Sequence, residues 1–256
     1  MQTVTAISIP LILSLETATP GGSVFLGRGK LELATRTGDP QVSHSNSLLR
    51  DISNCLEEAG VSLQDVDLFA CASGPGSFTG LRIGIATLKA LAVTLRRPCA
   101  GIPTLHAVAY AAGPSRATVA LLPAGRGEVF AQMFSVSESG IVTEMDSAAH
   151  LSPQKLVNKY GTIGDLTWAG SGAHLQRKLL EDYANQQGIV FTEHKSGAKA
   201  TNKRRGWILA PPESNLAAHL AALALQKFER GEVESPQSLS AFYVRPSDAE
   251  LKEQCR

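Results

Sequence analysis

Hydrophobic and polar positions along the first hundred residues predict strands followed by helices. Short apolar runs bounded by turn residues are typical of strands, and they occur at 11–17, 23–27, 31–35 and 66–72. Apolar residues spaced three and four apart predict two helices, at 43–59 and 77–96. Gly60 is the usual kind of residue to end the first of them.

The same order of elements begins again after Pro114. Three predicted strands, a helix, a strand and a second helix follow one another at 118–122, 129–136, 141–145, 152–160, 166–169 and 173–184. A final helix is predicted at 215–228, and strand-like residues follow at 237–246. No sequence identity links the halves, so the repeat is one of element order and predicts an α/β protein with two similar units.

The second predicted helix is apolar on most of its sides. Its long charged residues, Arg82, Lys89 and Arg96, are spaced seven apart and form one stripe. A helix that is apolar in most other directions has to be covered on most sides. It is therefore either a central core helix or a helix that also forms a protein–protein interface.

Composition and charge narrow the class of protein. The chain of 256 residues is 43% hydrophobic and 18% charged, which excludes disordered, collagen-like and coiled-coil proteins. Its 24 basic and 23 acidic residues give a net charge of +1, which argues against a free-standing electrostatic nucleic-acid binder. The four cysteines are widely spaced, as expected of reduced thiols. We expect neither a signal peptide nor a membrane span, and hence a cytoplasmic protein.

The most distinctive local run is Ser-Gly-Pro-Gly-Ser-Phe-Thr-Gly-Leu-Arg at 73–82, between a strand and a helix. Backbone N–H groups in such a turn favour an anion. The run lacks the Lys of a Walker A loop, and its third glycine comes one residue too late for G-x-G-x-x-G. A tight structural turn is therefore an equally good interpretation. The candidate nucleotide- or anion-binding residues are Glu16, Thr17, Gly74, Gly76 and Ser77.

Sequence signals for catalysis and for metal binding are weak. No G-x-S-x-G motif occurs, and the six histidines never pair four apart on one helix. We therefore predict no catalytic residue and no metal ligand. The basic run 195–206 is interpreted as a solvated surface loop, with contact to RNA or another anionic partner as the alternative. The residues of that alternative are Lys199, Lys203, Arg204 and Arg205.

The chain resembles the TsaB (YeaZ) family, bacterial proteins of threonylcarbamoyladenosine biosynthesis on tRNA. The run G-P-G-S-F-T-G-L-R-I-G-I-A at 74–86 carries the resemblance most specifically. Further matching runs are I-L-S-L-E-T-A-T at 12–19, G-I-P-T-L at 101–105, G-E-V-F at 127–130 and F-Y-V-R-P at 242–246.

The resemblance implies an actin/Hsp70-like (ASKHA) fold of two ribonuclease-H-like lobes with mixed sheets. The lobes would be 1–103, with a helix at about 213–232 packing on it, and 104–212, followed by a tail at 233–256. The resemblance also implies a non-catalytic paralogue of the transferase TsaD. Thr104 and Val108 stand where TsaD has its metal-binding His-x-x-x-His pair, and His106 between them cannot replace both. Pro-Ala-Gly at 123–125 replaces the family's usual D-A-R.

The function implied is that of an accessory subunit. It would bind and activate TsaD in forming threonylcarbamoyladenosine next to the anticodon of tRNAs. Its partners would be a TsaD-type transferase, a TsaE-type ATPase and, in isolation, a second copy, with tRNA contacted indirectly. It would hold no cofactor of its own, although ATP or ADP can sit at the partner interface. The alternative is a stand-alone nucleotide-dependent or peptidase-like enzyme of the same fold.

The partner interface implied by the resemblance is formed by the first two helices. One of these is the helix whose apolar character already suggested an interface. The expected contact residues are Leu48, Leu49, Ile52, Leu81, Ile85 and Leu88.

Overall fold

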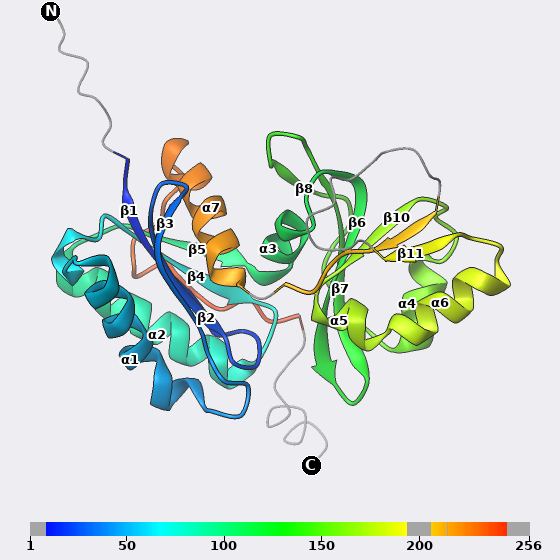
Figure 1. The fold of residues 1–256 in the computed structure, drawn as a ribbon, viewed down its shortest axis with the longest axis horizontal. Helices are drawn as coiled ribbons and strands as arrows, with labels where there is room; N and C mark the ends of the chain where they lie inside the picture. The colour runs from blue at the N-terminus through cyan, green and yellow to red at the C-terminus, as the bar shows by residue number, and fades with distance from the viewer. Residues whose placement is uncertain (1–8, 194–205, 214, 245–256) are drawn as a thin grey trace, which may run out of the picture.

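The computed structural model describes residues 9–193, 206–213 and 215–244, and shows two lobes that each contain one sheet (Figure 1). The sheet of the first lobe has the strand order β3-β2-β1-β4-β5. β1 is antiparallel to β2 and parallel to β4, so the sheet is mixed. The strands are β1 (Leu11–Glu16), β2 (Ser23–Arg28), β3 (Leu31–Thr37), β4 (Leu68–Gly74) and β5 (Cys99–Pro103).

The second lobe repeats this topology. Its sheet has the order β11-β12-β10-β6-β7-β8, so that β8-β7-β6-β10-β12 corresponds to the five strands of the first lobe, and β9 pairs separately with β7. The repeated order of elements is therefore confirmed. The strands are β6 (Ser115–Gly125), β7 (Glu128–Val136), β8 (Val142–Glu144), β9 (Ala149–Leu151), β10 (Leu166–Ala169), β11 (Phe191–Glu193) and β12 (Trp207–Leu209).

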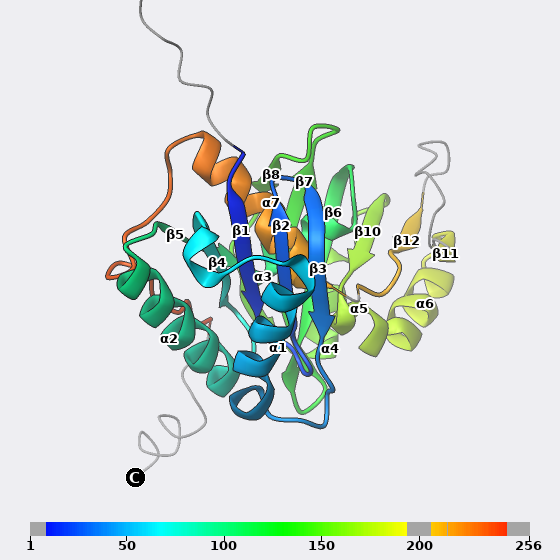
Figure 2. The same ribbon diagram turned by 60° about the vertical axis from the view of Figure 1, so that its left-hand side comes forward.

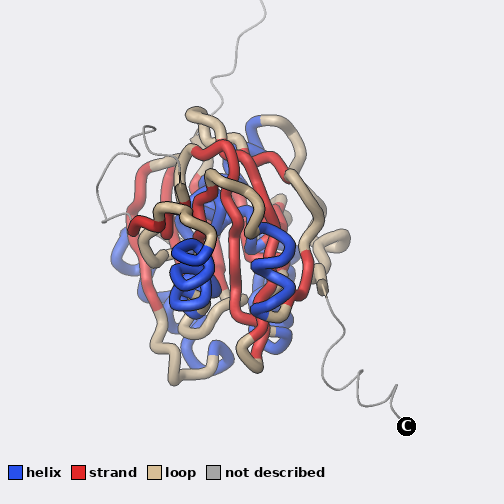
Figure 3. Tube along the Cα trace, turned by 90° about the vertical axis from the view of Figure 1, so that its right-hand side faces the viewer, coloured by secondary structure: helices blue, strands red, loops and turns tan. Residues whose placement is uncertain are grey.

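Helices cover the outer faces of both sheets and fill the space between them. α1 (His44–Ala59) and α2 (Phe78–Leu95) lie side by side on the outer face of the first sheet (Figure 2). α3 (Thr104–Ala111) and α7 (Leu216–Glu229) lie between the sheets (Figure 1). The outer face of the second sheet also carries helices (Figure 3). The helices of the second lobe are α4 (Pro153–Tyr160), α5 (Ser171–Leu175) and α6 (Arg177–Gln186), and η1 (Leu63–Asp65) is a short 3-10 turn in the first lobe.

α7 belongs structurally to the first sheet, although it follows the second lobe in sequence. It packs on β1 and β2, and its Ala217 N–H donates a hydrogen bond to the Ser23 hydroxyl over 3.1 Å. α3 contacts strands of both sheets. Because α3 contacts both sheets, the structure does not divide the lobes at a single point, and the boundaries at 103 and 212 remain a proposal.

Two predictions about local structure are wrong. The helix expected at 173–184 is interrupted at Gln176, so that α5 and α6 are separate helices. The Gln176 side chain is buried and donates to the carbonyl of Gly127 over 2.6 Å, a contact that draws the chain toward the β6–β7 turn. The strand-like residues at 237–246 form no strand within 237–244, where the tail instead runs as coil along the first lobe.

α2 is the longer of the two helices on the outer face of the first sheet. The Ser77 hydroxyl caps it by accepting from the Gly80 N–H, and the helix ends at Arg96, which adopts the left-handed conformation. By length and composition alone it could cross a membrane. Instead, its buried residues pack toward β4 and the rest of the first lobe's core, which is how a core helix behaves.

Candidate functional site

Glu16 closes the turn between β1 and β2 with its own carboxylate. The side chain is only 2% exposed. It accepts hydrogen bonds from the N–H groups of Ala18 and Thr19, over 2.6 and 2.8 Å, and from the Thr19 hydroxyl over 2.6 Å. Burial raises the pKa of the Glu16 carboxyl, and the hydrogen bonds from Thr19 and Ala18 only partly oppose this shift. Both carboxylate oxygens are thus used by the loop itself.

The raised pKa of Glu16 predicts a pH-dependent stability. A carboxyl whose pKa is higher in the folded than in the unfolded state stabilises the fold below the unfolded pKa, and this contribution is lost as pH rises through the folded pKa. Glu16→Gln keeps a carbonyl oxygen as acceptor and removes the ionisation. We expect the free energy of unfolding, measured in urea from acidic to neutral pH, to shift in favour of the variant as pH rises. A difference between the two proteins that does not change with pH would contradict this.

The start of α2 packs directly on the end of β1. A Cβ atom on Gly80 would collide with the carbonyl oxygen of Thr17, and one on Gly84 would collide with the Thr17 hydroxyl. The N–H of Ser77 donates to the carbonyl of Ala18 over 2.7 Å. The N–H of Ser77, which could have faced an anion, therefore faces the β1–β2 loop.

The two candidate glycines, Gly74 and Gly76, also allow close packing. A Cβ atom on Gly76 would meet Ala18, and one on Gly74 would meet the carbonyl oxygen of Phe242 in the tail. The structure thus brings the five candidate residues from 16–17 and 74–77 together, as the sequence suggested. Their arrangement favours the tight structural turn over an anion-binding site.

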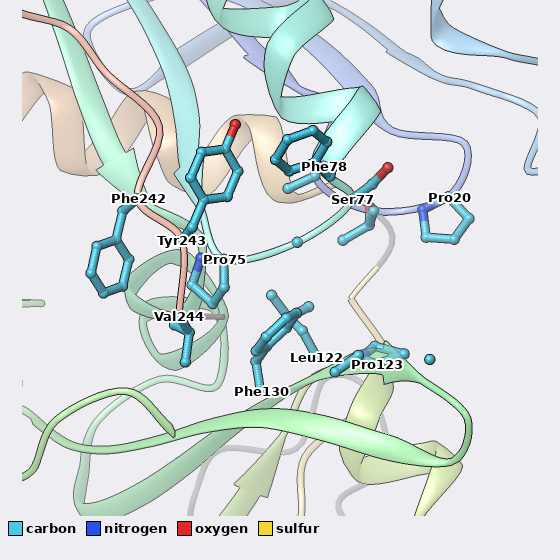
Figure 4. A pocket seen from close by; sticks show the side chains of 15 residues that line it. Pro20, Pro75, Ser77, Phe78, Leu122, Pro123, Phe130, Phe242, Tyr243 and Val244 are labelled. Carbon is cyan, nitrogen blue, oxygen red and sulfur yellow. The ribbon is translucent and has the colours of Figure 1, made fainter. Parts of the chain in front are cut away.

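A cavity of about 310 Å³ lies beside this turn, between the lobes (Figure 4). Among the described residues, no charged side chain lines it, and Pro123 and Ala124 form part of its wall on the second lobe. A phosphate group held by these residues alone would lose its water without meeting a positive charge, which is unfavourable. Most of the side chains that line it are apolar or aromatic, namely Pro20, Pro75, Phe78, Leu122, Phe130, Phe242, Tyr243 and Val244 (Figure 4).

The positions that correspond to the transferase's metal-binding pair lie inside the core. Thr104 and Val108 are buried on α3. His106 points elsewhere and pairs with Glu144 of β8 over 3.0 Å, while burial lowers its pKa. Within the part of the chain that the structure describes, no three His, Cys, Asp or Glu side chains are grouped to hold a metal ion.

Five of the six expected interface residues are in the wrong place for contact with a partner. They are buried in the first lobe because α1 and α2 turn their widest apolar stripes toward the sheet. The prediction is therefore wrong for Leu48, Ile52, Leu81, Ile85 and Leu88. Leu49 alone remains a candidate, since its side chain is 67% exposed.

The solvent side of α2 is nevertheless apolar. Ala86, Ala90 and Val93 are exposed and follow one another at helical spacing, and partly buried Ile83 extends the row toward α1. On α1, Glu58 pairs with Arg36 of β3, so Leu49 lies on the opposite flank, the one toward α2. We call these residues, Leu49, Ile83, Ala86, Ala90 and Val93, the outer face. The short alanine repeat was the sequence signal that could have identified it.

The basic-run residues Lys199, Lys203, Arg204 and Arg205 lie outside the described residues. So do the first eight residues of the chain.

Comparisons with known proteins agree on one family. The family model described as TsaD, tRNA N6-adenosine threonylcarbamoyltransferase, matches residues 40–229. The tRNA threonylcarbamoyladenosine biosynthesis protein TsaB of Escherichia coli (strain K12) is 28% identical over 244 residues, which cover 91% of this chain and 94% of that protein. TsaB of Haemophilus influenzae is 39% identical over 106 residues, covering 40% of this chain and 42% of that protein.

Solved structures give the same result for the fold. YeaZ from Pseudomonas aeruginosa superimposes with a TM-score of 0.69 at 25% identity, covering 91% of this chain and 99% of that one. Component A of the (R)-2-hydroxyglutaryl-CoA dehydratase of Acidaminococcus fermentans shares the fold alone, with a TM-score of 0.50 at 11% identity, covering 85% and 98%. With its two mixed sheets and this ASKHA fold, the chain belongs to the TsaB (YeaZ) family of tRNA threonylcarbamoyladenosine biosynthesis proteins.

Proposed function

We propose that this protein is an accessory subunit that binds a TsaD-type transferase and activates it for threonylcarbamoyladenosine formation next to the anticodon of tRNAs. The observation that carries this proposal is the outer face. It is an apolar surface, centred on Ala86 and Ala90, on the solvent side of α2. Contiguous exposed apolar surface is typical of protein–protein contact. It also lies on the two helices that the family resemblance implicates.

We further propose that the chain performs no chemical step itself. The Glu16 carboxylate accepts hydrogen bonds from its own loop, and Gly80 and Gly84 pack directly against Thr17. The described residues that line the neighbouring cavity include no charged side chain that would hold a phosphate. These features give no support to the alternative, a stand-alone nucleotide-dependent or peptidase-like enzyme. Tight binding of ATP or ADP by the isolated chain in calorimetry would favour that alternative.

The remaining partners follow from the same proposal. A TsaE-type ATPase would join the complex, and a nucleotide, ATP or ADP, would sit at an interface between subunits rather than in this chain alone. In isolation, a second copy would cover the outer face. Contact with tRNA would be indirect, because the net charge of +1 offers little non-specific attraction to phosphate.

The decisive variant is Ala90→Asp. We expect it to weaken binding to the TsaD-type subunit at least about a hundredfold, because an unpaired charge in a desolvated interface costs several kcal/mol. Leu175→Asp is the control, since it places the same charge on an apolar, 55% exposed residue of the second lobe. Binding is measured by calorimetry with the transferase subunit of the same organism, and activity by tRNA modification with and without this chain.

Two outcomes would contradict the proposal. One is tRNA modification that proceeds equally well without this chain. The other is a folded Ala90→Asp variant that binds the transferase as the wild type does.

A further inference from the structure

Arg82 is held in place by a stack of aromatic rings. Its guanidinium carbon lies 3.9 Å from the ring centroid of Phe78. The Phe78 ring in turn lies 4.9 Å from that of Tyr243, tilted by 37° (Figure 4). Arg82 and Tyr243 thus each contact the ring of Phe78, which joins the first turns of α2 to the tail.

The tail that supplies Tyr243 is itself fixed to the first lobe. Lys89 of α2 donates to the carbonyl of Leu239 over 2.9 Å, and the Leu239 side chain is buried. The N–H of Phe242 donates to the carbonyl of Ser73 over 2.7 Å. These contacts hold the chain that leads to Tyr243 against the first lobe.

The edges of the Arg82 guanidinium remain available. The residue is exposed, and no carboxylate of the described ranges lies within ion-pair distance of it. α2 contains no acidic residue at all. A guanidinium is planar with N–H donors along its edges, so a ring packed on its flat face leaves those donors free and limits its rotation. Such preorganisation lowers the entropic cost of binding.

Arg82 stands at the end of the outer face, beside Ala86. The helical spacing of Arg82, Ala86 and Val93 places them on one stripe. A partner that covers the outer face therefore reaches the guanidinium as well. Interfaces of this kind are commonly dominated by a few arginine and aromatic residues.

We propose that Arg82 is the polar anchor of the outer face and pairs in bidentate fashion with a carboxylate of the partner protein, with Phe78 as its positioning residue. This inference rests on the proposed function and adds the chemistry of the partner: apolar surface beside an exposed Asp or Glu. A second copy fits less well where α2 meets α2, because both helices carry Arg82 and Lys89 and no acidic residue, so that its carboxylates would have to come from α1.

The test measures the dissociation constant with the TsaD-type transferase subunit by calorimetry. We expect Arg82→Ala to raise the dissociation constant about 10- to 100-fold, as for the loss of a charge-assisted hydrogen-bonded pair. Arg82→Lys should raise it less, because lysine keeps the positive charge but cannot donate two parallel hydrogen bonds to one carboxylate. Arg116→Ala is the control: it removes the same charge from an exposed residue of the second lobe, and it should change the constant less than about twofold. Added salt should weaken the wild-type complex more than that of Arg82→Ala.

The stack is tested separately. Phe78→Tyr keeps the ring and should bind as the wild type does, whereas Phe78→Leu should bind more weakly. In the Phe78→Leu background, Arg82→Ala should reduce the binding free energy less than it does in the wild type. The effects of substitutions at neighbouring residues that act together are not additive. Additive effects would overturn the positioning role of Phe78.

The outcomes separate this inference from the function on which it rests. If the wild-type chain does not bind the transferase, the proposed function fails. A second outcome is that the wild type binds the transferase and Ala90→Asp does not, while Arg82→Ala binds within about twofold of the wild type. In that case the proposed function stands and only the role of Arg82 as anchor is wrong. The anchor is also overturned if Arg82→Ala leaves transferase binding unchanged and only dissociates a dimer of this chain, as measured by light scattering.

Discussion

Leu88→Asp is expected to unfold the first lobe rather than to release a folded subunit from its partner. Leu88 is fully buried between α2 and the first sheet, in a cluster with Leu13 and Phe69. A carboxylate at this position would lose its water without a partner, in addition to the lost apolar contacts, so the destabilisation should exceed about 4 kcal/mol. Urea denaturation followed by circular dichroism measures it.

Ala90→Asp is the matched control, because it places the same charge two residues further along the same helix. Ala90 is exposed, so this variant should lose less than about 1 kcal/mol of stability and should lose partner binding instead. If Leu88→Asp folds with near-native stability and fails only in binding, the assignment of Leu88 to the core is wrong. The pair of variants thus separates the two roles of one helix.

Gly80→Ala is expected to destabilise the protein by about 3 kcal/mol. Replacing glycine by alanine in a helix normally stabilises it by about 1 kcal/mol. Here the new methyl group would collide with the carbonyl oxygen of Thr17, a backbone atom at the end of β1 that cannot rotate away. α2 and β1 would have to move apart. Thermal and urea unfolding both report the loss.

Two further glycine variants give the Gly80 prediction its controls. Gly84→Ala collides with the hydroxyl of Thr17, a side-chain atom, so that Thr17→Ala in the same molecule should restore much of its stability and should not rescue Gly80→Ala. Gly164→Ala has open space around its Cβ position and should be close to neutral. A Gly80→Ala protein as stable as the wild type would contradict the packing explanation.

The same packing limits the room for a nucleotide at the end of β1. In this chain the ends of β1 and α2 touch through glycines, and the acidic residue there, Glu16, closes a turn. Between the lobes, Pro123 and Ala124 present no charge to the cavity. The first lobe supports α1 and α2 through this packing, and the solvent side of the two helices is available to a partner.

The amino-acid sequence by itself determined the order of the main elements and the family. Helical spacing and a terminal glycine placed α1 within about a residue of its observed bounds, because such signals are local. The run at 74–86 was specific enough to identify the family. The short strands β5, β9, β11 and β12 were not predicted, because three to five residues carry little pattern and become strands through their neighbours in the sheet.

Only the tertiary structure decided what covers each apolar residue. Periodicity marked both Leu88 and Ala90 as parts of an apolar helix, and the packing of α2 on the sheet placed the first in the core and the second in solvent. The glycines at 74–84 were equally compatible with an anion and with a tight turn, since both require a missing Cβ atom. Contacts with Thr17, Ala18 and Phe242, distant in sequence, fill that space, and no local pattern could have revealed them.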